Sequence, residues 1–425
     1  MMKMKTKAVL IVMAALIVIG IFAPIVSAET AGEWHNKAIG FAMSGEYKKA
    51  IECFDKVIEL NPNSAGSYYN RGLVYKILKQ YERAIEDFNK TIELIPTFAG
   101  AYINRGDAYK NLKQYERAIE DFNKTIELDP NYALAYNNRG TAYSDLKQYE
   151  RAIEDFNKTI ELDPNYALAY NNRGTAYSDL KQYERAIEDF NKTIELIPDY
   201  PFAYSNRGLT YDNLKQYERA IEDFNKTIEL DPNSAAAYNN RGLTYDNLKQ
   251  YERAIEDFNK TIELIPNHTF AYNNRGLTYN NLKQYERAIE DFNKTIELDP
   301  NSAAAYNNRG NAYRKLEEYE RAIEDFNKTI ELDSNYAGSY YNRGLTYDDL
   351  KQYERAIEDF NKTIELDPNS AVIYTNRGNA FKDLGQYERA IEDYNKAIEL
   401  DPNDTDAYEN RELALSKLKE QEGEP

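Results

Sequence analysis

The amino-acid sequence predicts an all-α fold, a solenoid in which antiparallel helix hairpins of 34 residues stack one on the next. Two observations predict it. Segment 131–164 recurs as segment 165–198 with a single change, Asp163 to Ile197, and prolines recur at steps of 34 residues, with one double step where Ser334 replaces the proline. These prolines are Pro62, Pro96, Pro130, Pro164, Pro198, Pro232, Pro266, Pro300, Pro368 and Pro402. A repeat of this length is typical of solenoids, whose units share a continuous core.

The first helix of each repeat is predicted from its stripe of apolar and small residues. In the repeat that begins at Ala133, the run AYNNRGTAYSDL places Tyr136, Gly140 and Tyr143 on one helix face. Gly140 has no Cβ, which allows the partner helix to approach closely.

The second helix of the repeat is the run YERAIEDFNKTIEL. Ala152, Phe156 and Thr159 form its apolar face, and its charged residues, Asp155 among them, are expected to lie in water. The proline that follows ends the helix. Asn165 is expected to cap the first helix of the next repeat. Neither helix can bury its stripe alone, so each hairpin must pack against its neighbours.

Residues 1–28 have the pattern of a secretory signal. Three lysines precede an uncharged apolar run over residues 8–23, and Val26-Ser27-Ala28 supplies the small residues that a signal peptidase recognises. Cleavage is predicted between Ala28 and Glu29. The alternative is an uncleaved anchor, because residues 8–26 are just long enough to span a bilayer. Either way, the rest of the chain is predicted to leave the cytoplasm and to reside in the cell envelope or beyond it.

The composition excludes several classes of protein. Among 425 residues, 53 are Lys or Arg and 71 are Asp or Glu, giving a net charge of −18, so a nucleic-acid partner is not expected. One cysteine excludes a disulfide framework, and two histidines leave little material for a transition-metal site. A membrane is expected as a partner only if residues 1–28 are retained.

The repeat resembles the tetratricopeptide repeat, position for position, at Tyr136, Gly140, Tyr143, Ala152 and Phe156 and at the closing proline. The resemblance implies an array of about eleven units over residues 29–404, followed by a capping helix and polar tail over residues 405–425. Two departures stand out. The first unit has Ala38 in place of the glycine, and Arg139 and its equivalents replace the usual leucine. We expect that arginine to lay its stem on apolar surface and keep its charged head in water.

The resemblance also implies a right-handed superhelix whose concave groove, lined by the first helices, holds a peptide or helix of a partner protein. Two columns of asparagines fall at groove positions. They are Asn104, Asn137, Asn138, Asn171, Asn172, Asn206, Asn239, Asn240, Asn273, Asn274, Asn307 and Asn308. Amides can pair with a peptide backbone. Alternatively, the asparagines are repeat consensus copied with the fold. The mixed charge at the ends of the first helices favours a partner of mixed or net basic charge.

Eleven sequons for N-linked sugar occur in the chain. Nine are Asn-Lys-Thr within second helices, and we expect most of these to remain unmodified. Asn267 and Asn403 lie in turns and are the better acceptors in an exported protein.

The sequence contains no catalytic motif, and no enzyme activity, cofactor or catalytic residue is expected. The acid pairs recur in nearly every repeat, and Cys53 replaces an aspartate at a position expected to be exposed. Three functions remain open. The first is an exported protein-binding scaffold, for example in the assembly of an envelope complex; the second is a structural or cell-surface spacer; the third is a substrate-binding subunit of an envelope enzyme.

Overall fold

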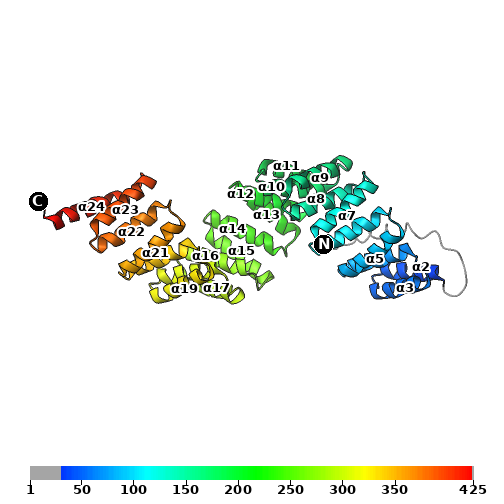
Figure 1. The fold of residues 1–425 in the computed structure, drawn as a ribbon, viewed down its shortest axis with the longest axis horizontal. Helices are drawn as coiled ribbons and strands as arrows, with labels where there is room; N and C mark the ends of the chain where they lie inside the picture. The colour runs from blue at the N-terminus through cyan, green and yellow to red at the C-terminus, as the bar shows by residue number, and fades with distance from the viewer. Residues whose placement is uncertain (1–29, 424–425) are drawn as a thin grey trace. The chain divides into compact units, whose positions relative to one another are not determined.

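The structure, a computed structural model, describes residues 30–423, and every regular element in that range is an α-helix (Figure 1). The first helices of the repeats are α2 (Ala31–Met43), α4 (Ala65–Ile77), α6 (Ala99–Asn111), α8 (Ala133–Asp145), α10 (Ala167–Asp179), α12 (Pro201–Asn213), α14 (Ala235–Asn247), α16 (Thr269–Asn281), α18 (Ala303–Lys315), α20 (Ala337–Asp349) and α22 (Ala371–Asp383). The second helices are α3 (Tyr47–Leu60), α5 (Tyr81–Leu94), α7 (Tyr115–Leu128), α9 (Tyr149–Leu162), α11 (Tyr183–Leu196), α13 (Tyr217–Leu230), α15 (Tyr251–Leu264), α17 (Tyr285–Leu298), α19 (Tyr319–Leu332), α21 (Tyr353–Leu366) and α23 (Tyr387–Leu400). A final helix, α24 (Thr405–Glu422), follows. The predicted all-α array of antiparallel hairpins is confirmed.

The predicted signal segment, with its cleavage site between Ala28 and Glu29, lies outside the described residues. Within residues 30–423, no helix is both long and apolar enough to cross a membrane.

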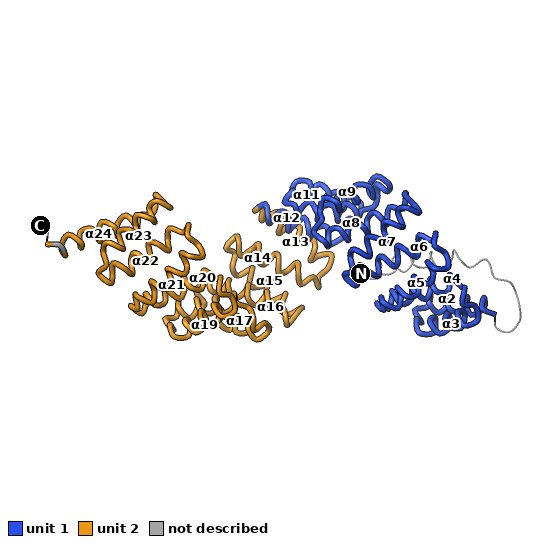
Figure 2. The backbone as a smooth tube through the Cα atoms, in the orientation of Figure 1, with its two compact units in different colours: residues 1–214 blue, residues 215–425 orange. Residues whose placement is uncertain are grey.

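The chain divides into two compact units, residues 1–214 and residues 215–425 (Figure 2). In the first unit, the helices from α2 to α11 pair in sequence as hairpins, and α12 packs on α11. In the second unit, the helices from α14 to α23 pair in the same way, with α13 packed on α14 and α24 on α23. Within a unit, each second helix also packs against the first helix of the next repeat. Each core is therefore built from contacts between neighbours in sequence.

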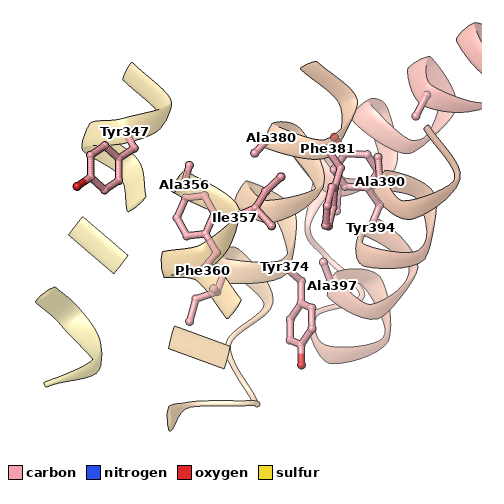
Figure 3. Packing of buried hydrophobic residues seen from close by; sticks show 13 residues of the cluster. Tyr347, Ala356, Ile357, Phe360, Tyr374, Ala380, Phe381, Ala390, Tyr394 and Ala397 are labelled. Carbon is pink, nitrogen blue, oxygen red and sulfur yellow. The ribbon is translucent and has the colours of Figure 1, made fainter. Parts of the chain in front are cut away.

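Each interior hairpin closes on an aromatic ring opposite a glycine. Ala152 and Phe156 are fully buried, and a Cβ added at Gly140 would lie 2.8 Å from Cε1 of Phe156. Such a distance requires the ring or the helices to move, so the predicted role of Gly140 in close approach is confirmed. Figure 3 shows the corresponding core in the second unit, where the rings of Phe360 and Tyr394 lie among small residues of neighbouring helices.

The turn inside each hairpin requires a left-handed backbone conformation. Lys147 has a φ of 59°, and eight other non-glycine residues at equivalent positions have φ between 57° and 61°. The equivalent residues in the first and last hairpins are Gly45 and Gly385. Glycine is the usual residue for this conformation, because a Cβ makes it less favourable.

Asn165 does not cap the helix that follows it, contrary to the sequence prediction. The capping position of α10 is Tyr166, whose side chain makes no capping bond. The backbone N–H of Asn165 donates to Oδ1 of Asp163 at 3.0 Å. The turn after the proline carries the chain one residue further than expected before the helix begins. At the same position as Tyr166 in other repeats, Ser234, Ser302 and His268 do cap their helices.

An arginine clip joins each interior hairpin to the hairpin before it, and it corrects two expectations. Asp155 is only 5% exposed and receives two bonds from Arg139, Nε to Oδ2 at 2.8 Å and Nη2 to Oδ1 at 2.6 Å. The third nitrogen, Nη1, donates to Oδ1 of Asn123 in the preceding repeat at 2.6 Å. The expectation that Asp155 and the head of Arg139 lie in water is wrong, because the planar guanidinium matches a carboxylate in two-point contact.

The same two-point pair is present in both units. Its members are Arg71–Asp87, Arg105–Asp121, Arg139–Asp155, Arg173–Asp189, Arg241–Asp257, Arg275–Asp291, Arg309–Asp325, Arg343–Asp359 and Arg377–Asp393. In the first repeat, Lys37 and Cys53 stand at the two positions. Cys53 is buried, so the expectation of an exposed cysteine is also wrong.

Candidate partner-binding surface

Two asparagine columns run along the first helices. The outer column consists of Asn104, Asn138, Asn172, Asn206, Asn240, Asn274 and Asn308, and all of them are half-buried. The inner column consists of Asn137, Asn171, Asn239, Asn273 and Asn307. In the inner column, Asn137, Asn171 and Asn307 are buried, with Asn137 only 7% exposed. The inner amides therefore offer a partner much less surface than the sequence suggests.

Hydrogen bonds between neighbouring repeats connect the two columns. Nδ2 of Asn172 donates to Oδ1 of Asn137, 35 residues earlier, at 3.1 Å. The same bond is present for Asn206–Asn171, Asn274–Asn239, Asn308–Asn273 and Asn342–Asn307, at 3.1 to 3.4 Å. These amides connect the repeats, whatever else they bind.

Tyrosines replace the inner asparagine at two repeats and preserve the bond. Nδ2 of Asn104 donates to the hydroxyl of Tyr69, and Nδ2 of Asn376 donates to the hydroxyl of Tyr341. Ile103, at the same position in another repeat, has no polar side-chain atom, and Asn138 accepts instead from Asn137 of its own helix at 3.5 Å.

Exposed apolar side chains share a helix face with the outer asparagines. On α16, Phe270, Asn274 and Leu277 are spaced four and three residues apart, which places them on one face. Phe270 is 75% exposed and Leu277 is 37% exposed. On α14, Leu243 is 38% exposed, and in the first unit α12 repeats the pattern with Phe202, Asn206 and Leu209. Sequence reasoning missed these residues, although Phe202 and Phe270 were visible as the two aromatic residues at their position in the repeats.

Comparison with protein families identifies the repeat. Ten consecutive segments of 34 residues, from residue 65 to residue 404, match the model described as the tetratricopeptide repeat, and residues 41–78 match a second model described as a TPR repeat. The chain belongs to the tetratricopeptide repeat family. No curated protein matches it.

Solved structures of tetratricopeptide repeat proteins resemble this chain. A tetratricopeptide repeat protein from Parabacteroides merdae is 22% identical, with a TM-score of 0.51 over 59% of this chain and 99% of that one. Yeast Tom70 is 17% identical, with a TM-score of 0.44 over 92% and 96%. YrrB, "a TPR protein with an unusual peptide-binding site", is 27% identical, with a TM-score of 0.37 over 44% and 96%.

A second contact between neighbouring tetratricopeptide repeats lies near the end of each first helix. We call it the joint pair: a residue in the last turn of one first helix and the residue 32 positions later in the next. In the joint pair of α14 and α16, the hydroxyl of Thr278 donates to Oδ1 of Asp246 at 2.8 Å. In the joint pair of α10 and α12, the hydroxyls of Ser178 and Thr210 lie 3.4 Å apart.

Where the first position of the joint pair is lysine or arginine, the side chain bonds to residues other than the second position. Lys76 donates to Asn104 at 2.7 Å and forms an ion pair with Asp107, and Lys382 donates to Asn410 at 2.7 Å. Arg314 pairs with Asp349 at 2.7 Å. The charges of Lys76 and Arg314 are therefore neutralised by a carboxylate of the next repeat, whereas Lys382 bonds to a neutral amide.

In the nine sequons within second helices, both the asparagine and the threonine make structural contacts. Their asparagines each accept a hydrogen bond from Nη1 of the arginine clip in the next repeat. Their threonines are buried, with Thr159 fully inaccessible. The asparagines of all eleven sequons are exposed, but Asn267 and Asn403 lie in turns between helices rather than within a helix.

The two histidines and the cysteine contact other residues of the fold. The His35 ring lies against Phe54 and bonds to Ser67 at 2.9 Å, and burial lowers the pKa of its imidazole. Nδ1 of His268 accepts from the N–H of Ala271 and so caps α16. Burial raises the pKa of the Cys53 thiol, which lowers its reactivity. Among residues 30–423, no group of three or more His, Cys, Asp or Glu residues is arranged to hold a metal ion.

Proposed function

We propose that this tetratricopeptide repeat protein is a non-enzymatic scaffold, exported from the cytoplasm, that holds a peptide or helix of a partner protein against its first helices. The exposed apolar face of α16 supports the proposal most directly. A phenylalanine that is 75% exposed contributes nothing to the core of its own repeat, yet it is aligned with a half-buried amide and an exposed leucine. Apolar anchors beside polar groups are typical of peptide-binding surfaces.

The partner is expected to supply apolar side chains and a mixed or net basic charge. Phe270 and Leu277 provide contacts for aliphatic or aromatic anchors, and the outer asparagines provide donors and acceptors for the backbone between them. The chain has a net charge of −18, so an acidic partner meets repulsion at long range.

Export and N-linked sugar are part of the same proposal. If the chain is exported through a compartment with an N-glycosylation system, the exposed Asn267 and Asn403 are the acceptors, and the nine helix sequons stay unmodified. Intact mass and glycopeptide analysis of the protein from its native envelope fraction test this directly. Sugar on Asn259 or another helix sequon would contradict it.

The test of partner binding uses the chain from residue 29 onward as bait in an envelope fraction. The informative variant is Phe270→Ser with Leu277→Ser, because both side chains are exposed and make no bond between repeats. Changing the asparagines is less informative, since their loss also breaks contacts between repeats. We expect the variant to lose the retained protein while its circular dichroism spectrum is unchanged.

A matched control is Ile265→Ser, which removes another exposed apolar side chain, 45% exposed, from the turn before α16. The control should retain the partner. If the double variant and the control retain the same material, the first helices do not bind it, and the role of a structural spacer should be preferred. If the retained material is an enzyme, titration of its substrate against the purified scaffold separates an assembly role from a substrate-binding one.

A further inference from the structure

In some joint pairs the polar side chain at the first position has a hydrogen-bond partner, and in others it has none. The residue at the second position makes the difference. Where the first position is aspartate or serine and the second is threonine, the threonine hydroxyl can bond to the first residue, as in Asp246–Thr278 and Ser178–Thr210. Where the second position is alanine, a polar first residue has nothing to bond to. Within the described chain, Oγ of Ser144, Oδ1 of Asn280 and Oδ1 of Asp348 are buried without a hydrogen-bond partner, and they face Ala176, Ala312 and Ala380.

Asp348 is the only one of these three that carries a charge. Its orphaned oxygen lies where α20 meets α22, and Ala380, labelled in Figure 3, is fully buried in the core beside it. A buried carboxylate oxygen without a donor destabilises the contact more than a neutral hydroxyl or amide does.

The surroundings of Asp348 add further negative charge. Asp383 on α22 and Asp349 on its own helix repel it, and burial, followed by Asp383 and Asp348, raises the pKa of Tyr353 on α21. Two cations are near, but each has another partner: Arg314 on α18 pairs with Asp349, and Lys382 on α22 donates to Asn410. Burial, and then repulsion by Asp383 and Asp349, raises the pKa of Asp348 to about 6.

We propose that the contact between α20 and α22 is a pH-sensitive joint, which is strengthened when Asp348 takes up a proton. The folded joint binds this proton more tightly than the opened joint, in which the carboxyl has its ordinary pKa near 4. The closed form is therefore favoured as the pH falls through 6, and the gain is complete below pH 4, where the opened form is protonated as well. If the first helices bind a partner as proposed above, this joint adjusts their spacing near the end of the array.

Hydrogen exchange of the full chain, read by mass spectrometry, tests the proposal. Peptides that contain Asp348 and Asp349 identify α20, whose first nine residues also occur in α4, and the full sequence of α22 is unique in the chain. After correction for intrinsic exchange rates, we expect protection in α20 and α22 to rise from pH 7.5 to pH 5 by several-fold, and by at most about tenfold, the ratio set by one pKa displaced by about two units. Protection in α14 should change much less, since Thr278 satisfies Asp246.

Two variants separate the proton from other effects. Asp348→Asn should give protection that is high at both pH values and independent of pH. Ala380→Thr supplies the missing hydroxyl and should raise protection at pH 7.5 while reducing its dependence on pH. If α20 and α22 respond to pH no more than α14, or if Asp348→Asn retains the response, the joint is not controlled by Asp348. Partner binding is not measured here, so failure of this proposal leaves the proposed function standing.

Discussion

The first hairpin and the interior hairpins share one backbone plan but differ in three features. An interior hairpin such as α16 and α17 has a glycine against the aromatic ring, an arginine clip, and a lysine in the left-handed turn. The first hairpin, α2 and α3, has Ala38, the pair Lys37 and Cys53, and Gly45 at the same places. An interior repeat must contact a repeat on each side, whereas the first repeat has none before it among the described residues. Of these features, only the Nη1 bond of the clip reaches the preceding repeat, and the first hairpin has no such repeat to bond to among the described residues.

Breaking the clip should give the largest effect. In Arg241→Met, Asp257 keeps its buried position and loses both bonds from the guanidinium, and we expect a loss of about 3 kcal/mol in the stability of the surrounding repeats. Hydrogen exchange in α14 measures it, because the sequence of α15 is shared with eight other second helices. Arg411→Met on α24 is the control, because no aspartate of a following helix pairs with Arg411 in this structure, and it should cost less than about 1 kcal/mol.

The first hairpin allows the converse experiment. Cys53→Asp places a carboxylate at a buried position without its arginine and should destabilise α2 and α3 by about 2 kcal/mol. Adding Lys37→Arg should recover most of that loss, as measured by urea unfolding. If the double variant is no more stable than Cys53→Asp alone, the clip needs more than its two charged residues.

Removing the close approach should give a smaller loss. The added Cβ of Gly276→Ala would lie 2.7 Å from Cε1 of Phe292, and relieving that contact should cost about 1–3 kcal/mol. Ala38→Gly in the first hairpin is the matched reverse change, and it should cost about 1 kcal/mol through helix propensity alone. Equal losses in the two thermal melts would show that packing does not distinguish the hairpins.

Supplying a donor to a neutral orphaned group should stabilise the array slightly. Ala312→Thr places a hydroxyl where Thr278 and Thr346 already fit at equivalent positions, and a bond to Oδ1 of Asn280 should add about 1 kcal/mol. The urea midpoint measures this gain. A loss of stability in Ala312→Thr would mean that the threonine does not fit between α16 and α18.

Relieving the strained turn should give the smallest effect. Lys249 has a φ of 58°, and Lys249→Gly should stabilise its hairpin by about 0.5 kcal/mol, because glycine adopts this conformation without a steric penalty. Gly45→Lys in the first hairpin should cost about the same amount. Thermal melts of the two variants should shift in opposite directions.

The helices and their order could be predicted from the sequence because they depend on local patterns. The 34-residue period, the apolar stripes and the prolines locate both helices of each repeat, and the glycine against the aromatic ring follows from the same spacing. The exact start of a helix could not be predicted: Asn165 and Tyr166 compete for the capping position, and the geometry of the turn decides between them.

The clip and the joint pair depend on distances between helices, which no single pattern encodes. In the sequence, Arg139 and Asp155 fit the pattern of two solvated charges, and only the closed hairpin brings them into contact. Differences between repeats did carry the signal: arginine and aspartate are replaced together, by Lys37 and Cys53, in the one repeat where the clip is absent. For the asparagine columns, the sequence indicated their positions but not that their amides bond to each other.

The arginine clip also has a consequence for how such a gene can grow. Every interior repeat brings one arginine, one aspartate that accepts two of its hydrogen bonds within the same hairpin, and one asparagine that accepts a bond from the arginine of the next repeat. Inserting another 34-residue copy between two existing ones therefore leaves no member of the clip unmatched. Segments 131–164 and 165–198, which differ at one position, are what such an insertion leaves behind. The array can change its length by recombination within its own coding sequence without passing through an unstable intermediate.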